Sequence, residues 1–417
     1  MSETRRERWS AGQILTVTLL TVGYMGYYAC RSHLSVSSTS IIEEFAAQGL
    51  TKEGMWSMPP IGSLFDLLGK FMGGCFAVRF GGRTSFLMGM LGAAFFTVLF
   101  ALGGPGMFLF AWSGNRLIQA FGWPGMVRVV GHWFSPKVFG TSMGLVSLSY
   151  LFGPLLSKLL FGRIFDAVWG WRQLFFLAAA CLGAIFVACA LMLRESPPET
   201  TPPEAEHSVI TPKPRATQIL GKLVTNKAFW IVCILSFGFT LLRETFNNWS
   251  PTYLELAAGL TKGDASRASS LFDLFGAISV LIVGGWSDKL GQRGRALLIG
   301  GGLTISTGLL AMLAASGDRP GTLMAIGIVA SVALVMIGPY SMLAGSISLD
   351  MGGKEGGATA SGWIDGVGYL GGIISGWTIG KLAEQSGWGS AFGLLAITAA
   401  ISAGVAAYWY SGSSRNS

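Results

Sequence analysis

Cationic side chains occur inside segments of the chain that are otherwise apolar. There are six such residues, which are Arg31, Lys70, Arg116, Arg128, Lys158 and Arg243. A cation at the centre of a bilayer costs about 2.5 to 3.5 kcal/mol on the insertion scale, so each must be paired or face water. Candidate acidic partners inside the same segments are Asp66, Glu244, Asp273 and Asp365. The surplus of positive charge predicts a binding site for an anion.

Arg31 and Arg243 are the strongest candidates for that site. Arg31 follows a run with the sequence Gly-Tyr-Met-Gly-Tyr-Tyr-Ala-Cys, and Arg243 follows Gly-Phe-Thr-Leu-Leu at an equivalent place in the second half of the chain. Two guanidinium groups suit a phosphate, because each presents a planar fork of donors to two oxygens. We expect mainly structural roles, in ion pairs or extended toward the membrane surface, for Arg116, Arg128 and Lys158.

Other polar residues near these arginines have two interpretations. Lys70 could reach the bound anion, or it could pair with Asp66, which lies four residues earlier on the same helix face. Tyr24, Tyr27 and Tyr28 could offer hydroxyl groups to the anion, or they could pack in the core or against lipid. Both interpretations stay open for these four residues.

The segments that carry these residues are long enough to cross a membrane. Of 417 residues, 51% are hydrophobic and 12% are charged, and the mean hydropathy is +0.55. A soluble chain would carry about twice this charge. The polar breaks leave about twelve apolar segments of roughly 18 to 28 residues, enough for a ~30 Å hydrocarbon core. We therefore predict an all-α membrane protein with spans at 12–40, 56–79, 84–103, 106–132, 138–165, 172–193, 229–256, 266–288, 294–316, 322–349, 356–383 and 389–410.

A polar, proline-rich segment divides the chain. Residues 194–228 contain Ser-Pro-Pro-Glu, Thr-Pro-Pro-Glu and Thr-Pro-Lys-Pro, a composition that is incompatible with a spanning helix and typical of a linker. We predict an N-terminal six-helix half at 1–193, a cytoplasmic linker at 194–228 and a C-terminal six-helix half at 229–417.

The two predicted halves repeat short motifs. Gly74–Gly81, followed by Arg83, ends the second segment, and Gly284–Gly291, followed by Arg293 and Arg295, ends the eighth. Internal repeats of this kind are typical of transporters whose substrate site lies between the repeats.

The distribution of charge predicts an orientation in the membrane. The net charge of +8 does not indicate nucleic-acid binding, because the basic residues form no stripe with interleaved aromatics. Lys and Arg are concentrated on the side of the termini and the linker, which the positive-inside rule assigns to the cytoplasm. No removable signal peptide is indicated, so we expect a multi-pass protein of the cell inner (plasma) membrane.

No motif predicts enzymatic chemistry. The sequence contains neither a P-loop nor residues at metal-ligand spacing, so we expect no cofactor, no metal and no direct use of ATP. A single chain with two six-helix halves encloses a complete pathway, and we expect it to function as a monomer.

Four stretches carry a resemblance to a known family. They are Gly23–Arg31, Gly122–Ser135, Leu242–Leu254 and Gly368–Gly372. They resemble the organophosphate:phosphate antiporter family of the major facilitator superfamily, which includes glycerol-3-phosphate and hexose-phosphate transporters, and the resemblance extends along essentially the whole chain. It implies twelve transmembrane helices in two pseudo-symmetric six-helix halves. It also implies that Arg31 and Arg243 bind the phosphate, and that the site includes Lys70, Tyr24, Tyr27, Tyr28 and Tyr369.

The chain departs from this family at three positions. The family's site histidine in the fifth helix is replaced by Tyr150, and an aspartate after the seventh-helix arginine is replaced by Asn248; we keep both in the candidate site. Val78 stands where the superfamily loop usually has an acid. Loss of the histidine argues against a histidine-assisted or proton-linked step, whereas the arginine pair is retained.

The expected function is exchange of a small phosphorylated organic anion for inorganic phosphate by alternating access. One alternative is a membrane sensor that binds a sugar phosphate and signals to a kinase. Another is a transporter of the same superfamily that carries an organic carboxylate. Glycerol phosphate, hexose phosphates and phosphoglycerates all remain open as the organic substrate.

Overall fold

The computed structural model describes residues 9–166, 170–198, 215–317 and 320–413. Within these ranges the regular elements are helices. The first group comprises α1 Ala11–Phe45, η1 Ala46–Gln48, α2 Lys52–Phe80, α3 Gly82–Leu102, α4 Pro105–Gln119, α5 Gly122–Trp133, η2 Pro136–Val138, α6 Phe139–Asp166 and α7 Trp171–Met192. The second comprises α8 Ala216–Val224, α9 Lys227–Leu256, α10 Lys262–Ser316, α11 Thr322–Met342, η3 Leu343–Ile347 and α12 Ser348–Ser413.

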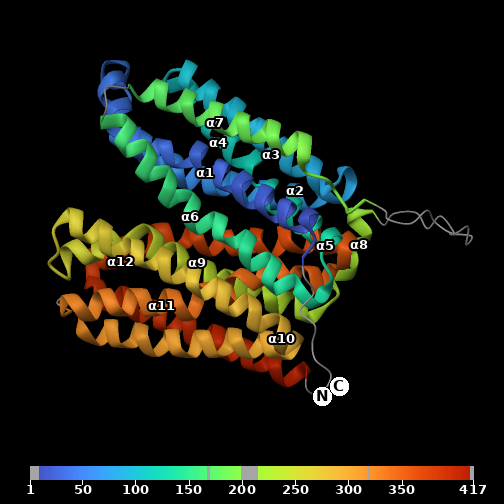
Figure 1. Cartoon of the computed structure of the whole chain (residues 1–417). Helices are drawn as coiled ribbons and strands as arrows, with labels where there is room; N and C mark the ends of the chain where they lie inside the picture. Colours follow the sequence, from blue (N-terminus) through green and yellow to red (C-terminus); the bar gives the residue numbers. More distant parts are fainter. Residues whose placement is uncertain (1–8, 167–169, 199–214, 318–319, 414–417) are drawn as a thin grey trace, which may run out of the picture.

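The helices form two bodies that diverge at one end. Helices α1 to α7 make up the N-terminal half and helices α9 to α12 the C-terminal half, with the short α8 beside them (Figure 1). The halves meet at the end where α1 begins and α12 ends, which we call the terminus end, and they diverge at the opposite end (Figure 1). The all-α fold class predicted from the sequence is confirmed.

The helices agree with most of the predicted spans. Within the described residues, nine stretches are long and apolar enough to cross a membrane. One of them, Thr322–Gly376, covers two predicted spans, whereas the predicted span 106–132 is divided between α4 and α5. Glycines at positive φ interrupt the longest helices between predicted spans: Gly291 in α10 and Gly387 in α12 adopt φ values of 64° and 80°, which glycine tolerates without strain. The twelve-span count stays a prediction.

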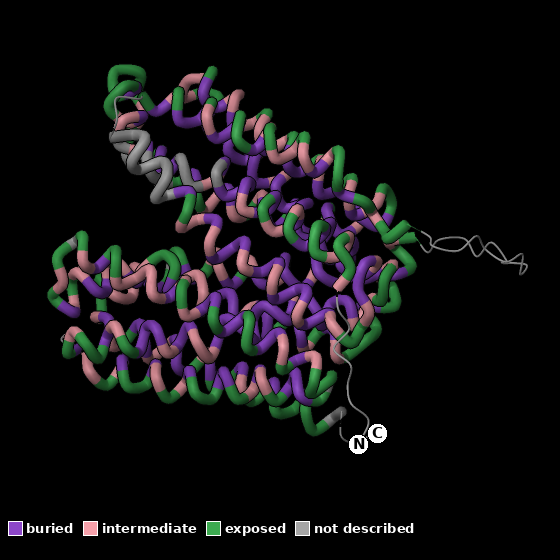
Figure 2. The backbone as a smooth tube through the Cα atoms, in the orientation of Figure 1, coloured by how far each residue is buried: buried purple, intermediate pink, exposed green. Residues whose placement is uncertain are grey.

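The outer surface of the bundle is apolar. Leu102, Leu191 and Leu323 expose 71%, 81% and 87% of their surface, and Figure 2 shows exposed residues along the outer faces with buried residues between the helices. Large exposed aliphatic side chains on long helices indicate a surface that faces lipid rather than water.

Glycines allow the two halves to touch through their backbones near the terminus end. A Cβ atom on Gly140 of α6 would lie 2.6 Å from the carbonyl oxygen of Gly284 of α10, and one on Gly74 of α2 would lie 2.8 Å from the carbonyl oxygen of Ala358 of α12. Such approaches require residues without side chains. They close the interface between the halves on this side.

Polar contacts reinforce the same closed interface. The carboxylate of Asp288, in the loop motif of the eighth predicted span, accepts hydrogen bonds from the amides of Gly140 and Thr141 at 2.6 and 2.7 Å. Arg128 of α5 pairs with Glu355 of α12 at 2.9 Å. Because the closed interface lies at the terminus end, the region between the halves opens toward the opposite end.

Candidate anion-binding site

Arg31 lies on α1 directly after a break in the helix. The backbone of Cys30 leaves helical geometry (φ −82°, ψ 15°), and its carbonyl oxygen accepts a hydrogen bond from Gln119 Nε2 of α4 at 3.4 Å. Arg31 Nε donates to Gln119 Oε1 at 3.1 Å, and Nη2 lies 3.3 Å from Oδ2 of Asp66 on α2. Its side chain retains 18% exposure, so the guanidinium is held but still accessible.

Behind Arg31, a buried polar network connects three further helices. Asp66 is fully buried, and its Oδ2 also lies 2.5 Å from Nη2 of Arg116 on α4. Gln119 Nε2 donates to Asn115 Oδ1 at 2.6 Å, and Asn115 in turn donates to Thr97 Oγ1 of α3 at 3.0 Å. We call Arg31, Asp66, Arg116 and Gln119 the Arg31 cluster.

Arg243 occupies the corresponding position in the C-terminal half. From α9, its Nη1 donates to the hydroxyl of Tyr340 of α11 at 2.7 Å, and its Nη2 lies 3.0 Å from Glu244 Oε1. The guanidinium carbon lies 5.3 Å from the ring centroid of Tyr150 and 5.0 Å from that of Tyr340. We call Arg243, Glu244, Tyr150 and Tyr340 the Arg243 cluster. Its arginine side chain is 14% exposed.

Lys70 pairs across the interface rather than along its own helix. Its Nζ lies 2.5 Å from Oδ2 of Asp365 on α12, and the two side chains are 3% and 9% exposed. The alternative in which Lys70 pairs with Asp66 is therefore wrong: its ammonium group is held by Asp365, and Asp66 Oδ2 is shared by Arg31 and Arg116. Lys70 also lies 5.5 Å from the ring centroid of Tyr369, which brings that tyrosine to the candidate site.

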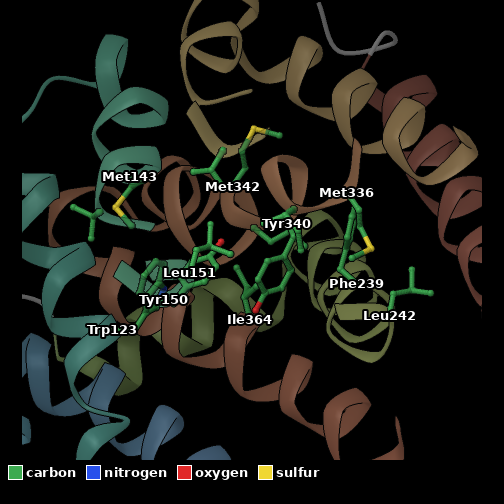
Figure 3. Packing of buried hydrophobic residues seen from close by; sticks show 14 of the residues in the cluster. Trp123, Met143, Tyr150, Leu151, Phe239, Leu242, Met336, Tyr340, Met342 and Ile364 are labelled. Carbon is green, nitrogen blue, oxygen red and sulfur yellow. The ribbon is translucent and has the colours of Figure 1, made fainter. Parts of the chain in front are cut away.

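Aromatic rings extend between the two arginines. Arg31 lies 5.2 Å from the ring centroid of Tyr28. From there, rings with centroids 5.6 to 5.9 Å apart lead toward Arg243 through Tyr28, Tyr24, Trp123 and Tyr150. In Figure 3, Trp123, Tyr150 and Tyr340 lie close together where the two halves meet. These four rings all belong to the N-terminal half, and the contact of Tyr150 with Tyr340 of α11, with ring centroids 6.4 Å apart, carries the row across to the Arg243 cluster.

The remaining predicted site residues occupy less central positions. Tyr27 is 2% exposed, and its hydroxyl donates to the carbonyl oxygen of Phe86 on α3 at 2.5 Å, so it packs the N-terminal half. Asn248 is exposed on α9, beyond the Arg243 cluster. The hydroxyl of Tyr150 is buried without a hydrogen-bond partner among the described residues. The side chain of Lys158 lies outside the described residues.

Ion pairs define the roles of the other intramembrane arginines. Arg128 lies 3.2 Å from Glu195 and 2.9 Å from Glu355, both near the terminus end, as expected for a structural arginine. Arg116 is also ion-paired, yet its pairing with Asp66 brings it to the candidate site. Around that site, the cations Arg31, Lys70, Arg116 and Arg243 outnumber the carboxylates Asp66, Asp365 and Glu244 by one.

Sequence reasoning missed several residues of the site. Gln119 and Asn115 are uncharged, and their signal was that they interrupt the apolar run 106–132 on one face of a helix. Trp123 and Tyr340 are aromatic residues within apolar runs, where packing alone explains such residues equally well. Their roles depend on which helices pack together.

The fold and the charged centre together define a membrane transporter, and the comparisons agree. The sequence profile of the Major Facilitator Superfamily matches residues 20–376, and the chain belongs to this superfamily. In its fold it is similar to the human organic anion transporter MFSD10 (TETRAN), with a TM-score of 0.72 at 14% identity over 94% of this chain and 99% of that one.

Relatives with higher sequence identity indicate a family within this superfamily. The chain is 25% identical to "Membrane sensor protein UhpC" of Salmonella typhimurium, over 96% of this chain and 91% of the relative. It is 26% identical to "Probable hexose phosphate transport protein" of Chlamydia trachomatis, over 88% and 84% of the two chains. It is also 26% identical to "Glycerol-3-phosphate transporter" of Bacillus subtilis, over 90% and 87%. The predicted resemblance to the organophosphate:phosphate antiporter family is confirmed. The prediction that the protein is not an enzyme is also confirmed, because the superfamily consists of transporters.

Proposed function

We propose that the protein exchanges a small phosphorylated organic anion for inorganic phosphate, with Arg31 and Arg243 clamping the phosphate group. The observation that carries this proposal is the matched placement of two partly exposed guanidinium groups, one in each half, linked by the row of aromatic rings. Their described contacts use only part of the N–H donors of each arginine, which leaves capacity for phosphate oxygens.

Alternating access follows from the charges of this site. In the empty site, Arg31 and Arg243 repel one another across the interface and resist closure at the open end. A phosphate dianion attracts both and stabilises the occluded state, in which both ends are closed. Reorientation is therefore favoured with an anion bound, which produces exchange rather than net leak.

The proposal includes an orientation and an organisation of the chain. We place both termini in the cytoplasm of the inner membrane, so the described conformation opens outward. The halves are taken as 1–193 and 229–417, joined by a cytoplasmic linker at 194–228, and the monomer is the working unit.

Phosphate exchange in proteoliposomes tests the proposal. Vesicles loaded with phosphate should take up radiolabelled phosphate, and external glycerol 3-phosphate or glucose 6-phosphate should compete. Arg31→Lys and Arg243→Lys should each lower exchange about 10- to 100-fold, because lysine lacks the planar fork. Arg267→Lys, at an arginine whose side chain is 80% exposed, is the matched control and should keep full exchange. Full exchange in both clamp variants would contradict the proposal.

A sensor is the second candidate, because a relative of similar length, UhpC, is named a membrane sensor protein. A sensor would bind a sugar phosphate through the same two arginines but would transport little of it across the membrane. Measurable glucose 6-phosphate binding by wild type, lost in Arg31→Lys, together with no exchange, would favour this candidate. Uptake of an organic carboxylate that phosphate does not inhibit would favour the organic-carboxylate transporter.

A further inference from the structure

The pair between Lys70 and Asp365 joins the two halves at the level of the candidate site. Lys70 belongs to α2 of the N-terminal half and Asp365 to α12 of the C-terminal half, and their charged atoms lie 2.5 Å apart. Both side chains are at least nine-tenths buried. By contrast, the ion pairs of Arg31, Arg116 and Arg243 each stay within one half.

This pair continues the closed interface from the terminus end toward the candidate site. Helices α2 and α12 run antiparallel, and their close contacts begin near the terminus end, where Gly74 approaches Ala358. One turn further, a Cβ atom on Gly362 would lie 2.4 Å from the carbonyl oxygen of Lys70 itself. Separation of the halves at the terminus end therefore requires the Lys70–Asp365 pair to break.

Breaking a buried ion pair leaves two charges without compensation, which is strongly unfavourable. Lys70 is also one helical turn from Asp66, the carboxylate that holds Arg31, so a phosphate bound at Arg31 lies within the field of Lys70. A bound anion can replace Asp365 as the partner of Lys70. The Asp365 carboxylate can then be hydrated as the interface opens.

We propose that Asp365 makes the exchange obligatory. When the site is empty, Asp365 holds Lys70 across the interface. A bound phosphate group releases Asp365 by pairing with Lys70 in its place. The coupling role rests on the proposed exchange of phosphates. The lock between the halves can be tested without transport.

Thiol labelling reports the lock directly. Thr359 of α12 is fully buried against Gly74, and cysteine is close to threonine in size. Thr359→Cys in nanodiscs should react slowly with a polar maleimide when no anion is present. The added Asp365→Asn substitution should speed this labelling about tenfold, because the unpaired Lys70 gains hydration by opening. Labelling of the native cysteines is measured in the same proteins without Thr359→Cys and subtracted.

Transport supplies the second readout. Proteoliposomes with Asp365→Asn should release phosphate about tenfold faster than wild type when no external anion is present. Asp264→Asn, which removes the carboxylate of an exposed pair with Arg267, is the matched control for both assays. Equal labelling rates with and without Asp365→Asn would overturn the lock, and fast labelling without phosphate release would overturn the coupling role. Lack of exchange in wild type would overturn the proposed function, while the labelling would still decide on the lock.

Discussion

The Nε atom of Arg31 donates a hydrogen bond to Oε1 of Gln119, 3.1 Å away on α4. Gln119 is 1% exposed and is itself held by its donation to Asn115, so the direction of the arginine fork is set by a rigid neighbour. A preorganised donor binds an anion more tightly than a mobile one, because less side-chain entropy is lost on binding.

Gln119→Leu tests this arrangement. The substitution removes the acceptor for Arg31 and should raise the KM for phosphate about fivefold, the value of roughly one hydrogen bond, with little change in kcat. Phosphate uptake over a range of concentrations measures it. Thr97→Val removes the acceptor at the far end of the same network and should leave KM nearer to wild type. Equal KM values in Gln119→Leu and wild type would contradict a positioning role.

Tyr340→Phe tests the corresponding contact in the C-terminal half. The variant keeps the ring beside Arg243 but loses the hydroxyl that accepts from Nη1 at 2.7 Å. Apparent phosphate affinity should fall about five- to tenfold, as expected for a hydrogen bond to a charged group. Tyr408→Phe, at a tyrosine that is 67% exposed, should match wild type in the same uptake assay.

Asp66→Asn should destabilise the whole protein. It leaves the guanidinium groups of Arg31 and Arg116 without their shared carboxylate in a buried site, at a cost of about 3 to 5 kcal/mol. Thermal unfolding of the detergent-solubilised protein should show a Tm lower by several degrees. In the exposed pair of Asp264 and Arg267, Asp264→Asn should lower Tm far less than Asp66→Asn does. A Tm unaffected by Asp66→Asn would show that the cluster contributes nothing to stability.

The contribution of Glu44 to stability should depend on pH. Hydrogen bonds from Arg172 and Trp171 lower the pKa of this carboxyl, which lies beyond the predicted span 12–40, below its ordinary value of 4.5. Because the folded pKa is the lower one, the stabilisation is present above pH 4.5 and is lost as the pH falls through the folded pKa. The carboxyl is largely exposed, so the effect is small, below about 1 kcal/mol.

Glu44→Gln measures that dependence. At neutral pH the variant should unfold at a slightly lower temperature than wild type, and the two Tm values should converge as the pH drops below 4.5. Glu384→Gln, at an exposed glutamate of α12, serves as the control and should keep the Tm of wild type at neutral pH. A Tm difference that persists unchanged into acid would mean that the ion pair with Arg172 is not its source.

Much of this protein follows from the sequence alone. Long apolar runs have no stable arrangement other than membrane-spanning helices, because lipid cannot satisfy backbone hydrogen bonds. Arg31 and Arg243 could be selected as candidates because intramembrane charges are costly and these two recur at equivalent places in a repeated sequence. The helical class was therefore predictable from local composition, and spacing was enough to put the two arginines forward as candidates.

The tertiary structure decided which charges meet. Spacing on one helix favours Asp66 as the partner of Lys70, but an i,i+4 pair is worth only about 0.2 to 0.5 kcal/mol. Packing instead brings α4 and α1 to Asp66 and α12 to Lys70, so Asp66 pairs with two arginines and Lys70 with Asp365. In a buried site each charge takes the partner with the best geometry, and that geometry depends on helices far apart in the sequence. The ion pair between the halves could therefore be recognised only once the helices were placed.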